Sequence, residues 1–314
     1  MKAWQFTSVG APLRSVELPD PVPGKGEIVI DIKAAGICHS DVGFMDGTIT
    51  SLLAFTPIVL GHEIAGVISS VGQGVTDFKV GQRVGIPATV ESPGTGRNGG
   101  FAEKVCVMAD QCVHIPDAVP FEQATPAMCA GKTAYQALVT AGRVEKGMNV
   151  GIIGFGGLGS LGVQIAKALG ANVYVAEVNR QAWESARKLG AEGVSDDIRD
   201  FESKQLDVIV DFAGYSVTTA SAIDAVRPKG RVIQIGLAEE MATISIQKVT
   251  MKEITYVGAA NAGTCEGADV LKLMADGSVK SHVIPVAFED IPESLEKLAK
   301  GGVQGRFVAI IDRE

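Results

Sequence analysis

The sequence predicts an α/β protein of two domains, a barrel-like domain of short strands and a doubly wound parallel sheet covered by helices. The length of 314 residues is typical of two domains. In the first part, short apolar or alternating segments lie between glycines, as in a β domain. From residue 126 onward, strand patterns alternate with helix patterns, which indicates βαβ units and a parallel sheet.

The strand patterns of the first part are short. Residues 27–34 (EIVIDIKA) alternate apolar and polar side chains, as a half-buried strand does. Residues 64–71, 83–86 and 101–107 give similar apolar signals. We therefore expect an all-β, barrel-like domain over this part of the chain.

The second part alternates strands with helices. Strands are expected at 149–153, 172–176, 208–210 and 232–235, and helices at 127–139, 158–169, 182–189 and 219–226. A helix at 268–275 and a strand at 306–311 remain. They are too short for a domain of their own, so we expect them to return to the first one. The predicted domains are 1–125 with 262–314, and 126–261.

Charge and cysteine content narrow the function classes. The net charge is −8 and no run of Lys or Arg exceeds two residues, so nucleic acid and anionic membranes are not expected partners. Residues 1–12 lack the apolar core of a secretory signal, and no apolar run is long enough to cross a bilayer. Five widely spaced cysteines indicate reduced thiols or metal ligands, and a cytoplasmic location is expected.

A glycine-rich turn lies at the start of the second domain. The expected strand 149–153 runs into GFGGLG, and a helix pattern follows. In this order the turn is a dinucleotide-binding fingerprint of the Rossmann type, although a glycine turn of another α/β protein is the alternative. The first glycine permits the turn, the second lets a pyrophosphate approach, and the last lets the helix pack closely. The candidate cofactor-binding residues are Gly154, Gly156, Gly157, Leu158 and Gly159, at a helix N-terminus.

The next expected strand ends at an acidic residue. Glu177 lies 18 positions after Gly159, near the spacing of about 20 residues for the acid that binds the adenosine ribose. A carboxylate there accepts hydrogen bonds from the ribose hydroxyls and repels a 2′-phosphate, which favours NAD. Arg180 is close enough to accommodate that phosphate, so NADP stays an alternative.

Three segments carry side chains suited to a soft metal. Cys38 stands in GICHSD, His62 in GHE and Cys129 in MCAG. Each alone has a plainer interpretation, a small buried hydrophobe or a hydrogen-bonded core histidine. Cys112 and His114 would face the same side of a strand. These two residues fit either a second metal site or an ordinary strand with a partly buried cysteine, and the ordinary strand is favoured.

Taken together, the motifs resemble a known family nearly end to end. They are GICHSD, GHEIAGVISSVGQGV at 61–75, NGGFAEKV at 98–105, CAGKTAY at 129–135 and the GFGGLG turn. The sequence resembles the zinc-containing medium-chain dehydrogenase/reductase superfamily, and within it the alcohol dehydrogenases. The resemblance implies a GroES-like catalytic domain and a Rossmann domain. It also implies hydride transfer between an alcohol, aldehyde or ketone and NAD.

The resemblance implies a catalytic zinc and its surroundings. Cys38, His62 and Cys129 correspond to the established Cys₂His ligand set of alcohol dehydrogenases, whose fourth position is open. Asp41 corresponds to a carboxylate that orients the histidine, and Glu63 to one that can enter the coordination transiently. Such a zinc depresses the pKa of an alcohol as it does that of water, so that hydride can leave.

The resemblance gives roles to three more residues. Ser40 corresponds to the hydroxyl that contacts the substrate oxygen and starts the proton's exit. His39 corresponds to a position beside the pyrophosphate, and Thr133 to one that faces the nicotinamide. Many relatives carry a histidine five residues after the first cysteine ligand, where this chain has Gly43. The proton is therefore expected to pass from Ser40 through the ribose to water.

A larger departure from the family concerns a structural metal. Relatives carry a lobe with four closely spaced cysteines that bind a second zinc, but residues 85–100 here contain neither cysteine nor histidine. We therefore predict one zinc per subunit. Residues 91–98 (ESPGTGRN) read as a polar, mobile loop in the place of the lobe.

Two rival functions agree less well with the sequence. A zinc-free, NADPH-dependent quinone or enone reductase of the same superfamily is disfavoured by the three ligands and Glu177. A catalytically silent nucleotide-binding protein is disfavoured by the intact ligand set with Ser40.

The substrate stays open, because the apolar side chains after the first ligand fit either a substrate pocket or core packing. They are Phe44, Met45, Leu52, Leu53 and Phe55. The resemblance also suggests a homodimer or homotetramer.

Overall fold

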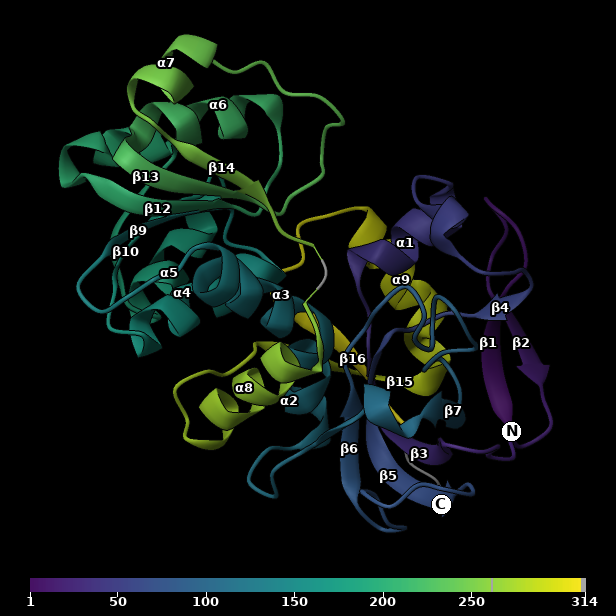
Figure 1. The fold of residues 1–314 in the computed structure, drawn as a ribbon. Helices are drawn as coiled ribbons and strands as arrows, with labels where there is room; N and C mark the ends of the chain where they lie inside the picture. The colour runs from purple at the N-terminus through teal and green to yellow at the C-terminus, as the bar shows by residue number, and fades with distance from the viewer. Residues whose placement is uncertain (261, 312–314) are drawn as a thin grey trace. The chain divides into compact units, whose positions relative to one another are not determined.

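A computed structural model of the protein describes residues 1–260 and 262–311. The chain forms two compact units (Figure 1), one of 1–132, 263–275 and 281–311, the other of 133–260, 262 and 276–280. The α/β fold class predicted from the sequence is confirmed. None of the described helices is both long and apolar enough to cross a membrane.

The end of the first unit lies at residue 132, whereas the sequence analysis placed it at 125. The backbone of Ala88 holds the intervening segment in the first unit. Ala88 N–H donates to the carbonyl of Met128 at 2.9 Å, and Lys132 Nζ donates to the carbonyl of Ala88. The boundary predicted from the sequence rests on the change from strand to helix patterns. These patterns carry no information about such long-range hydrogen bonds.

The first unit contains two sheets. The smaller has the order β2–β1–β4, and the larger β15–β16–β3–β5–β6–β8, with β7 also paired to β3. The smaller sheet consists of β1 (Lys2–Phe6), β2 (Arg14–Glu17) and β4 (Ile58–Val59). The larger consists of β3 (Glu27–Gly36), β5 (Glu63–Val71), β6 (Arg83–Ile86), β7 (Lys104–Met108), β8 (Val113–His114), β15 (Val283–Ala287) and β16 (Arg306–Ile310).

The register of β3 brings distant segments to one end of the larger sheet. Gly36, at the end of β3, pairs with Glu63 at the start of β5 and with Val308 on β16. Ile37 N–H then donates to the carbonyl of Phe307 at 2.9 Å. The residues that follow β3, precede β5 and begin β16 therefore meet at one place.

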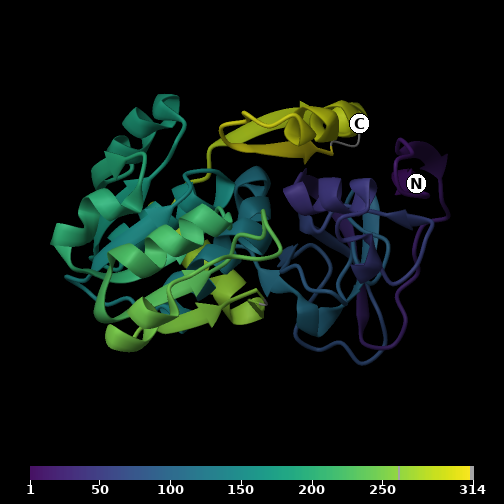
Figure 2. The ribbon, with the colours of Figure 1, turned by 90° about the horizontal axis from the view of Figure 1, so that it is seen from above.

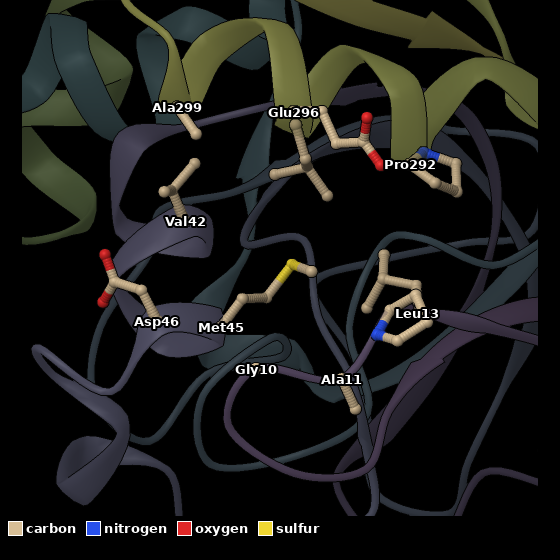
Figure 3. Close-up of a pocket in the computed structure, with 11 residues that line it drawn as sticks. Gly10, Ala11, Leu13, Val42, Met45, Asp46, Pro292, Glu296 and Ala299 are labelled. Carbon is tan, nitrogen blue, oxygen red and sulfur yellow. The ribbon is translucent and has the colours of Figure 1, made fainter.

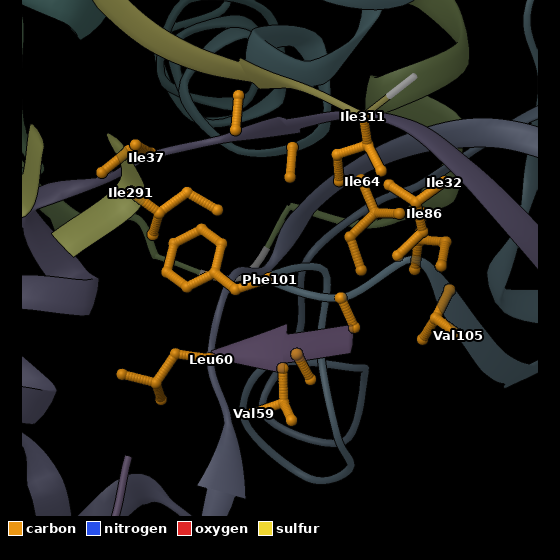
Figure 4. Packing of buried hydrophobic residues seen from close by; sticks show 14 of the residues in the cluster. Ile32, Ile37, Val59, Leu60, Ile64, Ile86, Phe101, Val105, Ile291 and Ile311 are labelled. Atoms are coloured by element: carbon orange, nitrogen blue, oxygen red, sulfur yellow. The ribbon is translucent and has the colours of Figure 1, made fainter. Parts of the chain in front are cut away.

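An apolar core supports this end of the sheet. Figure 4 shows part of it, with Ile32, Ile64 and Ile86 of β3, β5 and β6 grouped together and Ile291 beside the ring of Phe101. Ile32, Ile64 and Ile86 are buried, and burying one such side chain contributes about 1.5–3 kcal/mol. The alternation at 27–34 thus predicted a real strand whose apolar side chains form the core.

The sequence predicted a helix at 268–275 but missed the other three of the first unit, whose described residues form four regular helices. The four are α1 (His39–Asp46), α2 (Phe121–Pro126), α8 (Thr264–Ala275) and α9 (Ile291–Ala299). Of the three missed helices, α1 and α9 pack against each other, and Figure 2 shows α9 with β15 and β16 in the yellow C-terminal segment. α9 buries Ile291, Leu295 and Leu298 at helical spacing, a signal that was present but not used.

Helix α1 depends on its ends more than on its composition. Its first turn is capped by Asp41, whose carboxylate accepts the backbone N–H of Cys38. It ends at Gly47, where φ is 100°, a conformation that favours glycine. Eight residues without a clear apolar stripe gave no helical period to detect.

The second unit is a six-stranded parallel sheet with the order β11–β10–β9–β12–β13–β14. Its strands are β9 (Asn149–Ile153), β10 (Asn172–Ala176), β11 (Ala191–Ser195), β12 (Leu206–Asp211), β13 (Val226–Gln234) and β14 (Thr255–Gly258). In Figure 1, α4 (Gly157–Ala168) and α5 (Trp183–Lys188) cover one face, and α6 (Ser216–Ala225) and α7 (Ile246–Met251) the other. This is the doubly wound dinucleotide-binding order, which reverses between β9 and β12.

Candidate active site

The turn between β3 and α1 places Cys38 and Asp41 at the end of the larger sheet. Cys38 precedes α1, and its backbone N–H donates to Asp41 Oδ2 at 2.9 Å. Asp41 N–H donates in return to the Cys38 carbonyl at 3.0 Å. Asp41 has no exposed surface, so its carboxylate fixes this turn in the interior.

The same carboxylate holds His62. Asp41 Oδ1 lies 3.2 Å from His62 Nδ1 and accepts the backbone N–H of Gly61 at 3.3 Å. An Nδ1–H that donates to Asp41 leaves Nε2 of the imidazole free to bind a metal. One buried carboxylate therefore orients two segments that lie 21 residues apart in the chain.

Cys129 completes the cluster from a third segment. It lies in a π-helical turn, Ala127–Gly131, that continues α2 into α3 (Lys132–Tyr135). The sequence predicted a helix at 127–139, and the structure has the helical run with π-helical turns inside it. Such turns are frequent at functional sites, because the extra residue redirects a side chain.

Four side chains converge there in a set that can hold a metal. The ligand atoms of Cys38, His62, Glu63 and Cys129 lie within 4.8 Å of one another. In a tetrahedral zinc centre with Zn–S bonds of about 2.3 Å, two sulfur ligands lie about 3.8 Å apart. Two thiols, an imidazole and a carboxylate fit zinc, and among the described residues this is the one group of its kind. The structure thus brings together the residues that the resemblance singled out.

The two thiols and the imidazole of the cluster shift one another's pKa values. The hydrogen bond from Cys129 lowers the pKa of Cys38 well below its ordinary value, against the effect of burial. The same bond and burial raise the pKa of Cys129 well above its ordinary value. Burial lowers the pKa of His62, but Asp41 and Cys38 outweigh it, so that the pKa is raised well above 6.5. The cluster therefore holds protons on Cys129 and His62 that a metal would displace.

Arg306 is a buried residue of this site that sequence reasoning missed. Its Nη2 lies 2.9 Å from Glu63 Oε1, in an ion pair without hydrogen-bond geometry. Burial raises the pKa of Glu63 to about 7, although Arg306 opposes this. Arg306 comes from β16, far along the chain from the other members, and no local motif surrounds it.

The other predicted active-site residues lie on α1 and α3. Ser40 Oγ lies 3.7 Å from Cys38 Sγ, so a hydroxyl is present beside the cluster. His39 is exposed at the start of α1. Thr133 is half-buried on α3 and is the first residue of the second unit.

The glycine turn of the second unit has the geometry of its fingerprint. Gly154 has a φ of 87°, which few residues other than glycine adopt. A Cβ on Gly156 would meet nothing within 4 Å, whereas one on Gly159 would collide with the Gly154 carbonyl. Space thus lies open over Gly156 at the N-terminus of α4, and Gly159 permits close packing of helix and strand.

Glu177 and Arg180 lie at the end of β10, and only Glu177 reaches the glycine turn. Glu177 Oε2 accepts the backbone N–H of Phe155 at 2.7 Å, and Oε1 accepts that of Asn179 at 2.7 Å. Arg180 is exposed and its Nη2 lies 2.5 Å from Asp196 Oδ2. Arg180 is thus paired with a carboxylate on the surface.

The loop at 91–100 is packed, which corrects the expectation of a mobile polar loop. Ser92, Gly94 and Thr95 are buried. Gly94 N–H donates to the Arg97 carbonyl at 2.8 Å, and Gly96 N–H to the Ser92 carbonyl at 2.9 Å. The polar composition suggested solvent exposure, but these side chains and glycines serve hydrogen bonds inside a tight loop.

The apolar residues after Cys38 do not form a single pocket. A cavity of about 350 Å³ is lined by Val42 and Met45 of α1, by α9 and by residues 10–13, and Figure 3 shows the side chains that surround it. None of the four clustered residues lines it. Phe44 is buried with its ring edge-on to His62, the centroids 6.5 Å apart. Leu52 and Phe55 are exposed.

Cys112 and His114 show ordinary packing. Cys112 is buried, and burial raises its pKa to about 12. His114 is exposed at the end of β8 and stacks on Phe78 with ring centroids 4.6 Å apart. Neither belongs to a group of potential metal ligands among the residues that the structure describes.

Comparison with known proteins identifies the family. Residues 24–117 match "Alcohol dehydrogenase GroES-like domain" and residues 157–276 match "Zinc-binding dehydrogenase". The chain is 33% identical to an alcohol dehydrogenase of Geobacillus stearothermophilus, over 99% of this chain and 100% of that protein. The chain belongs to the zinc-containing alcohol dehydrogenases of the medium-chain dehydrogenase/reductase superfamily. Its function is zinc-dependent hydride transfer between an alcohol or carbonyl compound and a nicotinamide cofactor, and the zinc-free reductase is not favoured.

Two further similar proteins differ in cofactor. The chain is 28% identical to NADP-dependent alcohol dehydrogenase C 1 of Mycolicibacterium smegmatis, over 98% of this chain and 97% of that protein. It is 30% identical to acetophenone reductase from Geotrichum candidum, solved in complex with NAD. That likeness has a TM-score of 0.88 and covers 98% of this chain and 96% of that one. Family membership alone therefore leaves the choice between NAD and NADP to the residues of the site.

Zinc added to the metal-free protein at pH 7 is expected to release about two protons, because zinc binds thiolate and neutral imidazole. The raised pKa values of Cys129 and His62 mean that both hold a proton at this pH. Zinc affinity should therefore rise as the pH rises towards these values, and fall on acidification. Calorimetry in buffers of different ionisation enthalpy counts the protons, and zinc binding without release at pH 7 would contradict the assigned protonation.

Proposed function

We propose that this protein is an NAD-dependent alcohol dehydrogenase with one catalytic zinc per subunit, held by Cys38, His62 and Cys129. The observation that carries the proposal is the convergence of these side chains, with Glu63, to within 4.8 Å of one another. The three ligands leave a fourth tetrahedral position for the substrate oxygen. Residues 85–100 offer no ligands for a structural zinc, which supports a single metal.

The bound groups supply the redox chemistry, and the chain supplies orientation. Zinc acts as a Lewis acid that makes an alcohol easier to deprotonate, and the nicotinamide accepts the hydride. Asp41 holds the His62 ring by its Nδ1 at 3.2 Å, which fixes the tautomer with a free Nε2. The buried ion pair of Glu63 with Arg306 keeps a carboxylate beside the ligands without an unpaired charge.

Ser40 is the group placed to take the substrate proton. Its Oγ lies 3.7 Å from Cys38 Sγ, at the start of α1 and half-buried. A hydroxyl can accept the alcohol proton while passing its own proton onward. Gly43 has no side chain to continue a relay, so a hydroxyl of the bound dinucleotide would have to supply the next step from Ser40 to water.

The carboxylate of Glu177 supports NAD over NADP. It is anchored by the backbone N–H groups of Phe155 and Asn179, so it stays at the end of β10 next to the glycine turn. A fixed negative charge there repels a 2′-phosphate. Arg180 is paired with Asp196 and so offers less positive charge to that phosphate.

The proposed ligand set is tested by Cys129→Ala. Zinc content is expected to fall from about one per chain to nearly none, and alcohol oxidation by more than about 100-fold, because two ligands do not retain the metal. NADH binding, followed by fluorescence, should persist because the glycine turn is untouched. Cys265→Ala is the control, since this exposed cysteine lies outside the cluster. Full turnover in Cys129→Ala would contradict the assignment.

The cofactor proposal is tested by Glu177→Ala. Loss of hydrogen bonds to a charged group costs about 1.5–3 kcal/mol, so kcat/KM for NAD should fall about 10- to 100-fold. The value for NADP should fall less or rise, because the repulsion disappears. Glu184→Ala removes an exposed carboxylate on α5, paired with Lys188, and should leave the ratio of the two values unchanged. A wild-type protein that already prefers NADP would end the proposal.

A homo-oligomer is part of the proposal. Strand β14 is the last strand of its sheet and pairs only with β13 among the described residues. Tyr256 on it and Ile246 and Met251 on α7 are exposed. An open sheet edge beside apolar side chains favours pairing with a second copy. Sedimentation equilibrium should show a dimer or tetramer that Met251→Lys weakens, and a monomer at all concentrations would refute it.

A further inference from the structure

The loop at 91–100 contacts the segment that carries His62 through Gly94 and residues 98–100. Gly99 N–H donates to the carbonyl of Val59 at 2.8 Å, and Gly100 N–H to that of Gly61 at 2.7 Å. The side chain of Asn98 accepts the N–H of Val59 at 3.0 Å. The extended backbone before His62 is thus bound to the end of this loop.

Gly61 is held from both sides. Its N–H donates to Asp41 Oδ1 at 3.3 Å, and its carbonyl accepts Gly100 N–H. Its φ is 87°, so it sits in the left-handed region that favours glycine. The peptide groups next to His62 therefore have no freedom to rotate without breaking a bond to Asp41 or to the loop.

The loop approaches this segment so closely that it has no room for side chains. A Cβ on Gly94 would lie 2.6 Å from the Gly61 carbonyl oxygen and 2.9 Å from His62 Cα. A Cβ on Gly99 would lie 2.5 Å from the same oxygen. Real Cβ atoms essentially never come this close, so the glycines at these positions let two backbones pack directly on each other.

The loop is stiff enough to act as a support. Ser92 Oγ accepts the N–H of Thr89 at 2.8 Å and donates to the Thr89 carbonyl at 3.0 Å. Ala54 N–H donates to the carbonyl of Thr95 at 3.1 Å, and Arg97 Nη1 lies 2.6 Å from Glu27 Oε1. Bonds within the loop and to three other segments hold it in one conformation.

We propose that the loop at 91–100 positions His62 for the catalytic metal, through its glycine backbone and without a metal of its own. Asp41 fixes the rotation of the imidazole, and the loop fixes the backbone from which the ring projects. Both supports are needed, because a side chain bonded at Nδ1 still moves with its Cα. This inference rests on the proposed role of His62 as a metal ligand.

The matched test compares Gly94→Ala with Gly96→Ala. The Cβ of the first presses on Gly61 and His62, whereas that of the second lies equally close, at 2.6 Å, to the Glu91 carbonyl within the loop. Gly74→Ala is a second control. The φ of Gly74 is 86°, close to the 91° of Gly94, but a Cβ there would meet nothing within 4 Å. Circular dichroism and NADH binding check that each variant is folded.

Zinc affinity and cobalt spectra are the readouts. In competition with a chelator, Gly94→Ala should bind zinc about 10- to 100-fold more weakly, the loss typical when support of a ligand is removed. The visible absorption of its Co²⁺ form should shift, because these bands report ligand geometry. Gly96→Ala and Gly74→Ala should stay within about twofold of the wild type. Equal affinities and spectra in Gly94→Ala and Gly96→Ala would overturn the inference.

A second pair of variants decides the matter if Gly94→Ala does not fold. Asn98→Ala removes the acceptor for Val59 N–H and should weaken zinc binding, whereas Asn98→Asp keeps an acceptor oxygen and should restore it. Wild-type affinity in both would overturn the inference. If Cys129→Ala kept its zinc, that result would instead refute the proposed function. The failure of this inference and the failure of the proposed function are therefore distinguishable.

Discussion

The buried carboxylate of Asp41 is the contact on which the candidate metal site depends. It accepts the backbone N–H of Cys38, the backbone N–H of Gly61 and a bond from His62 Nδ1. A carboxylate without exposed surface is costly unless its oxygens are bonded. These three hydrogen bonds offset that cost. They also fix the turn before α1 and the ring of His62, so the bonds that allow Asp41 to be buried are the ones that orient the candidate ligands.

Around this carboxylate, each ligand comes from a segment held by a different kind of contact. Strand pairing of Gly36 with Glu63 brings two segments together, and the π-helical turn at Ala127–Gly131 brings the third. The ion pair of Arg306 with Glu63 ties in β16. Because several different contacts hold these segments, the fold itself brings the candidate ligands together, as a preorganised metal site requires.

The second unit uses backbone geometry in the same way. The turn after β9 lies where the strand order reverses, which is where dinucleotides bind in such sheets. Glu177 is tied to Phe155, so the acidic group and the glycine turn form one rigid corner. The sequence pattern predicted this corner well, because strand, turn, helix and acid all lie within about 30 residues and the chain between them is regular.

What the sequence determined by itself is the set of local devices. The alternation at 27–34, the βαβ succession, the glycine turn with Glu177, and the motifs of Cys38, His62 and Cys129 are each readable within a few residues, because period and turn chemistry are local. Only the tertiary structure decided that Arg306 joins the cluster and that the loop at 91–100 is packed on Gly61. It also showed that α1 begins where the carboxylate of Asp41 caps its first turn. These depend on strand register and on close backbone contacts between segments far apart in the chain, which leave no periodic trace in composition.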